Sequence, residues 1–241
     1  MVNTNHKMKI EVWSDVVCPF CYIGKRKLEA ALGQFAHSED IELEWKSSQL
    51  SPNTITDPTT NIDSYLAKHK GIALEEAKRL NSHVTGMAKQ VGLEYNFDKA
   101  VVANTFNAHQ MLHFAKEEGK QNEAKEKVMH AYFTDGKNID DPATLVELGE
   151  IIGLDPTELK KALENNTYSN AVKNDIQEAQ QLGVRGVPFF VFDRKYAISG
   201  AQDASVFTQT LEKSFSEWRS NNPEPLKVIE GDSCDIDGNC D

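Results

Sequence analysis

Alternation of hydrophobic and polar residues marks two short stretches near the start of the chain, residues 9–13 and 41–45, and predicts two β-strands. Between these stretches, apolar residues recur at helical spacing, at Leu28, Ala31, Leu32 and Phe35. A helix that connects two strands in this way is the crossover of a β-α-β unit. We therefore expect the two strands to pair in parallel.

Residues 57–182 have a different pattern, in which helical periodicity is continuous and no stretch alternates convincingly. Three helix starts are expected from one signature, an aspartate at the N-cap followed by proline at the first helical position: Asp57-Pro58, Asp141-Pro142 and Asp155-Pro156. The pattern predicts a block of about six or seven helices inserted into the α/β unit.

The strand pattern returns at residues 188–192 and 196–198, and the short turn at Asp193-Arg194 between them predicts a β-hairpin. A final helix is expected from near Asp203. Its apolar face consists of four large side chains, Phe207, Leu211, Phe215 and Trp218.

These elements predict an α/β fold in which a β-α-β half and a β-β-α half are separated by a large all-helical insertion. The expected parts are an α/β domain at residues 8–52 and 183–220, an inserted helical domain at 53–182 and an acidic tail at 221–241. The tail has six acidic residues against one lysine, so it carries a large part of the net charge of −11.

The overall acidity argues against nucleic acid or an anionic membrane as the main partner, because both are negatively charged. No apolar run approaches the length that crosses a membrane, and the amino terminus lacks the apolar core of a secretory signal. We therefore expect a cytoplasmic protein that binds neither nucleic acid nor membrane. Four cysteines in 241 residues are too few for a disulfide scaffold, and in a reducing compartment a close pair is more often catalytic.

Such a pair is formed by Cys18 and Cys21, which stand between the first predicted strand and the helix that follows. Pro19 fits the first helical position, which places Cys18 at the N-cap, where unpaired backbone N–H groups and the helix dipole favour a thiolate. Cys21 follows one helical turn later, close enough to attack a mixed disulfide at Cys18. The spacing therefore predicts dithiol–disulfide exchange, with Cys18 as the nucleophile and Cys21 as the resolving thiol.

The alternative interpretation of the two cysteines is half of a zinc site, which would need two further ligands. His109 and His113 have the spacing of zinc ligands on one helical face, but no glutamate lies between them and no third ligand is evident. We interpret both as core or interface histidines. We expect no metal at the cysteine pair, because a proline after the first cysteine fits redox chemistry better.

The order of elements, the cysteine pair and the Gly186-Val187-Pro188 loop before the third strand together resemble the thioredoxin fold with a DsbA-type helical insertion. The resemblance spans residues 8–219. Three segments are similar more narrowly to the FrnE-like branch of the DsbA family: residues 14–24 around the cysteines, residues 104–109 and the Val187-Pro188 loop.

This resemblance implies a cis peptide bond before Pro188, placed opposite Cys18. Val187 would then offer its N–H and C=O to an extended peptide beside the disulfide, as an added strand would. The implied partners are protein or peptide thiols and disulfides. No cofactor is implied, although glutathione or another thiol is a candidate electron donor. In a reducing cytosol, reduction or isomerisation of disulfides fits better than their insertion.

Two other function classes share features of this sequence. Two glutathione-dependent families have a similar architecture: the isomerases of the 2-hydroxychromene-2-carboxylate type and the kappa-class glutathione transferases. They carry serine where this chain has Cys18. A redox or metal sensor that binds its partner through the acidic tail is the third hypothesis.

The groups around the thiols bear on their reactivity. Pro19 and Phe20 cannot donate a hydrogen bond, so the helix terminus should supply most of the stabilisation. We predict a pKa of Cys18 between the values of about 3.5 for DsbA and about 7 for thioredoxin. Lys25 and Arg26 are expected on a solvated face, and Asp15 either accepts protons near the site or ends the strand.

A second cysteine pair, Cys234 and Cys240, lies in the acidic tail with a Gly-Asn turn between its members, so the two thiols can meet. This pair would relay oxidising equivalents to or from Cys18 and Cys21, or it would be a surface staple or part of a metal-holding tail.

Overall fold

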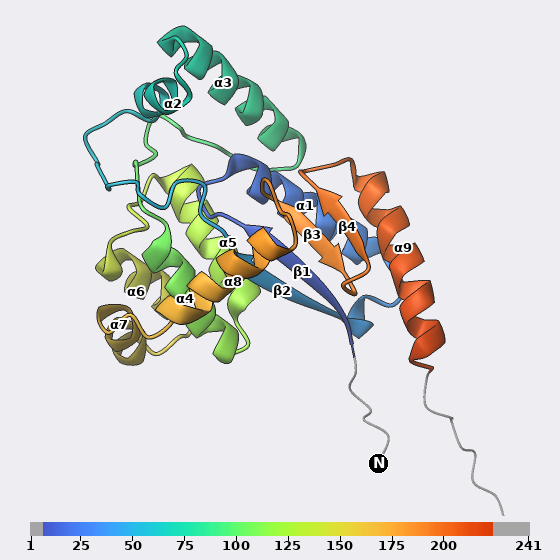
Figure 1. Ribbon diagram of the computed structural model, residues 1–241. Coiled ribbons are helices and arrows are strands. Elements are labelled where there is room, and N and C mark those ends of the chain that lie inside the picture. The colour runs from blue at the N-terminus through green and yellow to red at the C-terminus, as the bar shows by residue number, and fades with distance from the viewer. Residues whose placement is uncertain (1–6, 224–241) are drawn as a thin grey trace, which may run out of the picture.

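A four-stranded sheet lies at the centre of the computed structural model, which describes residues 7–223. The strands lie in the order β2 (Ile41–Ser47), β1 (Met8–Ser14), β3 (Phe189–Phe192) and β4 (Tyr196–Ser199). β1 and β2 are parallel, with Met8 opposite Ile41 and Ser14 opposite Ser47. β3 runs antiparallel to both β1 and β4 (Figure 1), so the predicted parallel pair and hairpin are both confirmed.

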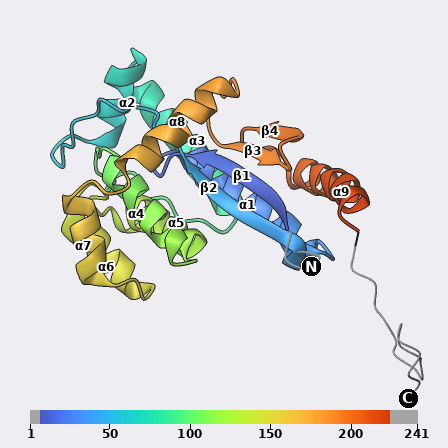
Figure 2. The same cartoon turned by 60° about the horizontal axis from the view of Figure 1, so that its bottom comes forward.

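Helices α1 (Pro19–Gln34) and α9 (Ala204–Asn221) pack against each other and against one face of this sheet (Figure 2). The four apolar side chains predicted for the last helix are all buried, at Phe207, Leu211, Phe215 and Trp218. They share a core with Leu28 and Ala31 of α1 and with Phe190 and Phe192 of β3. The amphipathic patterns of both helices are therefore satisfied by one surface of the sheet.

Between β2 and β3, the regular elements of the described chain are helices joined by loops. An isolated bridge between Asp57 and Val102 is the exception. The helices are α2 (Ile62–Lys70), α3 (Leu74–Gln90), α4 (Phe106–Glu117), α5 (Gln121–His130), α6 (Pro142–Ile151), α7 (Pro156–Glu164) and α8 (Ser169–Gln181), with a π-helical turn at Ala131–Asp135. α5 and α8 contact β2, and α3 contacts α1 (Figure 1). The predicted α/β fold with a large helical insertion is confirmed.

Two of the three predicted aspartate caps are present. Asp141 and Asp155 accept hydrogen bonds from backbone N–H groups in the first turns of α6 and α7. The prediction for Asp57 is wrong, because its N–H donates to the carbonyl of Val102 at 2.8 Å and its carboxylate binds Thr59 and Thr60. The helix begins instead after Asn61, whose side chain caps α2. The Asp57 backbone is thus held by a long-range pairing that local sequence does not encode.

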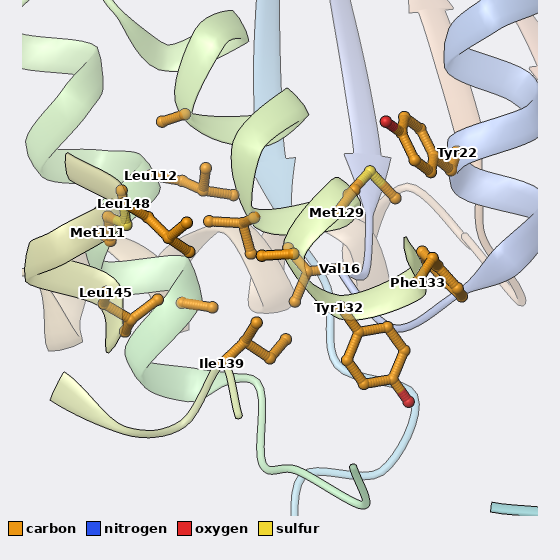
Figure 3. Close-up of a cluster of buried hydrophobic side chains, with 14 of the residues drawn as sticks. Val16, Tyr22, Met111, Leu112, Met129, Tyr132, Phe133, Ile139, Leu145 and Leu148 are labelled. Atoms are coloured by element: carbon orange, nitrogen blue, oxygen red, sulfur yellow. The ribbon is translucent and has the colours of Figure 1, made fainter. Parts of the chain in front are cut away.

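The larger hydrophobic cluster joins the insertion to the turn that carries the cysteines (Figure 3). Val16 and Tyr22 lie on the turn and on α1, while Met129 and Phe133 come from α5 and the π-helical turn. The ring of Tyr22 stacks on that of Phe133, with centroids 6.1 Å apart. Because burial of each such side chain stabilises the fold by about 1.5–3 kcal/mol, the insertion and the cysteine turn hold each other in place.

None of the helices within residues 7–223 is long and apolar enough to cross a membrane. The second cysteine pair, Cys234 and Cys240, lies outside the described residues, so its predicted role stays a prediction.

Candidate active site

Cys18 and Cys21 occupy the start of α1 as the sequence predicts. Cys18 has extended backbone angles at the N-cap, Pro19 is the first helical residue, and the N–H of Cys21 donates to the carbonyl of Cys18 at 3.0 Å. Cys18 keeps 4% of its surface exposed, whereas Cys21 is fully buried. Only Cys18 can therefore meet a substrate sulfur directly.

The loop before β3 lies against this helix start. The Val187–Pro188 peptide bond is cis, as the family resemblance implied. The thiol of Cys18 donates to the carbonyl oxygen of Val187, with a sulfur–oxygen distance of 3.6 Å. Gly24 of α1 allows the approach, since a Cβ atom there would lie 3.1 Å from Cγ of Pro188. The structure thus brings Cys18, Val187 and Pro188 together with Cys21 behind them.

Asp15 connects the cysteine turn to two other parts of the chain. Its backbone carbonyl accepts from the N–H of Cys18, and its carboxylate accepts from the N–H of Leu50 at 2.7 Å. The other carboxylate oxygen lies 3.3 Å from Nε2 of His109 on α4. Asp15 and His109 are both buried, and burial lowers the pKa of His109 against the opposing effect of Asp15. Asp15 therefore does more than end the strand.

A buried lysine from the insertion lies beneath the thiols, and the sequence analysis did not find it. Lys125 of α5 is fully buried, and its ammonium group lies 3.5 Å from the carbonyl oxygen of Ser14 and 5.4 Å from the centre of the Trp45 ring. Burial lowers the pKa of Lys125 to about 8, although the negative charges of Cys21 and Asp15 oppose the change. Its helix is polar in sequence, so only the tertiary structure shows that this one lysine points inward.

The two thiols lie close enough that each affects the pKa of the other. The hydrogen bond to Cys21 and burial raise the pKa of Cys18, with a further contribution from Asp15. Burial also acts to raise the pKa of Cys21, but the hydrogen bond from Cys18, the charge of Lys125 and the Ser14 hydroxyl lower it. The direction at Cys18 is therefore opposite to our prediction, which counted the helix terminus and left out the neighbouring thiol and the burial.

The positions of Lys25 and Arg26 differ from the solvated face predicted from the sequence. Lys25 is 2% exposed rather than solvated, and its ammonium group donates to Glu126 of α5 at 2.8 Å and also pairs with Glu29. Arg26 donates to the same two carboxylates. The hydroxyl of Tyr22 donates to Glu126 as well. This network fastens α1 to the insertion, so these cations are structural.

His109 and His113 do not converge on a common point as zinc ligands would. His113 lies 3.0 Å from the Asp175 carboxylate and 3.1 Å from the hydroxyl of Ser47, away from the Asp15 contact of His109. Both are buried, which confirms the interpretation as core histidines. Within residues 7–223, no group of three or more histidine, cysteine, aspartate or glutamate side chains is placed to hold a metal ion.

Comparison with known families identifies the family to which this chain belongs. The profile of the DSBA-like thioredoxin domain family matches residues 9–212. The chain belongs to this family. YwbO of Bacillus subtilis, a protein described as uncharacterized, is 31% identical over 204 residues, which are 84% of this chain and 94% of YwbO. The crystal structure of a probable DsbA oxidoreductase from Streptomyces coelicolor is 36% identical, covers 97% of this chain with 98% of its own and has a TM-score of 0.81.

More distant structures share the fold alone. The cytosolic disulfide reductase DsbM of Pseudomonas aeruginosa is 15% identical, with a TM-score of 0.63 over 87% of this chain and 99% of its own. A 2-hydroxychromene-2-carboxylate isomerase is also 15% identical, with a TM-score of 0.63 over 91% of this chain and all of its own. The thioredoxin-like fold is thus confirmed, and it is common to more than one reaction class.

Proposed function

We propose that this protein exchanges the Cys18–Cys21 dithiol and disulfide with protein or peptide substrates. The observation that carries the proposal is the contact between Sγ of Cys18 and the carbonyl oxygen of Val187, 3.6 Å apart. It places the more exposed of the two sulfurs beside the backbone of Val187. An extended peptide that paired with Val187 would present its own cysteine to Cys18.

The reaction follows from the burial of the two sulfurs. The Cys18 thiol gives its proton to water, and the thiolate attacks a substrate disulfide and forms a mixed disulfide. The first substrate sulfur leaves with the electron pair and takes up that proton. The Cys21 thiolate then attacks Cys18, forms the Cys18–Cys21 disulfide and releases the second substrate sulfur. The substrate gains two electrons and the protein loses two, so two molecules of an external thiol such as glutathione must reduce the pair again and leave as their own disulfide.

We propose reduction or isomerisation as the direction of exchange, given the reducing cytoplasmic compartment expected from the sequence. We also propose the FrnE-like branch of the family. In its support, His109 of the 104–109 motif contacts Asp15, and Asn104 binds the carbonyl groups of Pro52 and Thr54 in the loop after β2.

Two exposed apolar side chains flank the proposed peptide site. Phe20, between the cysteines, is 41% exposed, and Leu50, whose N–H binds Asp15, is 52% exposed. Large apolar side chains left in water beside a reactive group favour an apolar peptide partner. We therefore propose unfolded or partly unfolded polypeptides as substrates.

Reduction of insulin disulfides tests the proposal, with Cys18→Ser and Cys21→Ser as the variants. We expect both variants to lose catalytic turnover, because one lacks the nucleophile and the other cannot resolve the mixed disulfide. A glutathione-dependent isomerase of small aromatic compounds would keep its activity without Cys21. The Cys21→Ser variant should trap protein substrates as mixed disulfides at Cys18, and a reductant would release these substrates for identification. Absence of any trapped substrate would contradict the proposal.

A further inference from the structure

The burial of the Lys125 ammonium group needs a physical explanation, and the proposed reaction supplies one. The side chain of this lysine is fully buried, yet among the described residues no carboxylate lies within ion-pair distance of its ammonium group. The polar contact of that group is the carbonyl of Ser14, with the ring of Trp45 on another side. An ammonium ion buried without a partner costs several kcal/mol, about as much as a small domain can spare.

The Asp15 carboxylate, whose charge acts on Lys125, is already engaged. One oxygen of Asp15 accepts from the N–H of Leu50 and the other lies by His109. The titratable groups that act on Lys125 lie in the turn after β1, at the start of α1 and on α4: Asp15, Cys18, Cys21, Lys25 and His109. Its uncharged contacts are the carbonyl of Ser14 on β1 and the ring of Trp45 on β2. Of the titratable groups, Cys18 and Cys21 gain and lose a negative charge during the proposed reaction, and Cys21 is the one that is fully buried.

Ser14 fixes the position of the lysine relative to the cysteine turn. Its backbone carbonyl, at the end of β1, accepts from Lys125, and the next residue, Asp15, accepts from the N–H of Cys18. The positive charge of Lys125 also acts directly to favour the Cys21 thiolate. The ammonium group is therefore held at the end of the strand that leads into the cysteine turn. Both it and Cys21 are buried there, so water is excluded and charges interact strongly.

We infer that Lys125 supplies the counter-charge of the Cys21 thiolate and stores the proton that accompanies each turn of the redox cycle. This inference rests on the proposed exchange reaction. Lys125 acts through Cys21, so it is a positioning residue and not a catalytic one. It would make the resolving step fast at neutral pH, even though Cys21 is fully buried.

The charges and the proton of the resolving step balance. In the mixed disulfide, Cys21 is a thiolate and Lys125 is an ammonium ion. The sulfur–sulfur bond from Cys21 to Cys18 forms, the bond from Cys18 to the substrate breaks, and the electron pair leaves on the substrate sulfur. Lys125 then has no anionic sulfur beside it, so its proton is released and neutralises the departing thiolate. Reduction of the disulfide reverses these steps and returns the proton to Lys125.

The first test measures the resolving step in the full chain with Cys234→Ser and Cys240→Ser, so that only the active pair reacts. The substrate is the aromatic disulfide dithiobis-nitrobenzoate, whose first thiolate is released by Cys18 and whose second is released on ring closure by Cys21. We expect Lys125→Met to slow the second release about tenfold at neutral pH, as for a Cys21 pKa raised by about one unit. The first release should change much less, and the slowing should disappear at high pH.

Lys127→Met is the matched control, because Lys127 is exposed on the same helix. It should leave both releases unchanged. Thermal unfolding supplies a further control, since replacing an unpaired buried charge by methionine is expected to leave the stability equal or higher. Ring closure at the normal rate in Lys125→Met, or equal slowing in Lys127→Met, would overturn the inference.

The second test needs no variant at position 125 and therefore holds even if Lys125→Met does not fold. Nuclear magnetic resonance of the lysine Nζ atoms can follow the titration of Lys125 in the reduced and the oxidised protein. We expect Lys125 to lose its proton at a lower pH in the oxidised protein. Titration at the same pH in both states would refute the inference, whereas failure of the wild-type pair to react with dithiobis-nitrobenzoate would refute the proposed function itself.

Discussion

Gly24 of α1 and Pro188 of the loop before β3 are packed so closely that a methyl group on Gly24 would lie 3.1 Å from Cγ of Pro188 and 3.0 Å from Cζ of Phe190. The contact joins the helix that carries both cysteines to the loop that carries Val187. The absence of a side chain at position 24 therefore sets the distance across the active site.

Gly24→Ala tests this relationship. The added methyl group must push the Pro188 loop away, so we expect a loss of about 1–3 kcal/mol in unfolding free energy and slower insulin reduction. Gly33→Ala is the matched control on the same helix, because its Cβ would meet no atom within 4 Å. That change should stabilise the protein by about 0.5–1 kcal/mol and leave reduction unchanged. Chemical denaturation and turnover measurements on both variants check the prediction, and equal behaviour of the two would contradict it.

Phe20→Ser should separate substrate binding from stability. Phe20 is 41% exposed, so its replacement should change the unfolding free energy by no more than about 0.5 kcal/mol. If apolar peptides pack on this ring, kcat/KM for an unfolded protein substrate should fall up to about tenfold, since burial of a phenylalanine contributes about 1.5–3 kcal/mol and this one is partly buried already. Ile151→Ser, at an exposed position on α6, is the control. Reduction of a small aromatic disulfide should be unaffected in both.

Glu44 predicts a loss of stability in acid. Burial acts to raise its pKa, but hydrogen bonds from Lys116 and Lys9 and the charge of Lys46 lower it to about 2. Because the pKa of this carboxylate is lower in the folded than in the unfolded protein, its stabilisation is complete above about pH 4.3 and disappears as the pH falls toward 2. Glu44→Gln should cost at most about 3 kcal/mol at neutral pH and flatten the stability curve between these values. Urea unfolding across this pH range is the measurement, and a curve parallel to that of the wild type would contradict the prediction.

The burial of His109 predicts a second loss of stability on acidification, which begins at a higher pH than the loss due to Glu44. Burial lowers the pKa of His109, so the folded protein keeps the ring neutral where the unfolded chain binds a proton. Stability should therefore be complete above about pH 6.5 and fall as the pH decreases below that value. His109→Gln, which keeps a donor toward Asp15, should remove this pH dependence. The same substitution at exposed His130 should leave it in place, and unfolding curves between about pH 5 and 7 compare the two.

Local signals in the sequence were enough to predict most of the fold. Alternation over residues 9–13 and 41–45 predicted the central parallel pair, and the turn at Asp193-Arg194 predicted the hairpin, where both residues adopt positive φ. Asp141 and Asp155 were correct as caps because a cap is a contact between residues two or three positions apart. The cysteine pair was found for the same reason, since its chemistry depends on one helical turn.

Tertiary contacts decided what these signals could not. Asp57 does not begin a helix because it pairs with Val102, and Lys25 is buried because Glu126 on another helix meets it. Lys125 lies beneath the thiols because α5 packs on β1 and β2, a placement that nothing within α5 encodes. The sequence alone determined the elements and the reactive sulfurs, since those depend on neighbours along the chain. The ionisation of the sulfurs depends on their neighbours Asp15 and Ser14 and on each other, but also on burial and on Lys125 of α5. Only the tertiary structure supplies these last two, because burial and charge act through space.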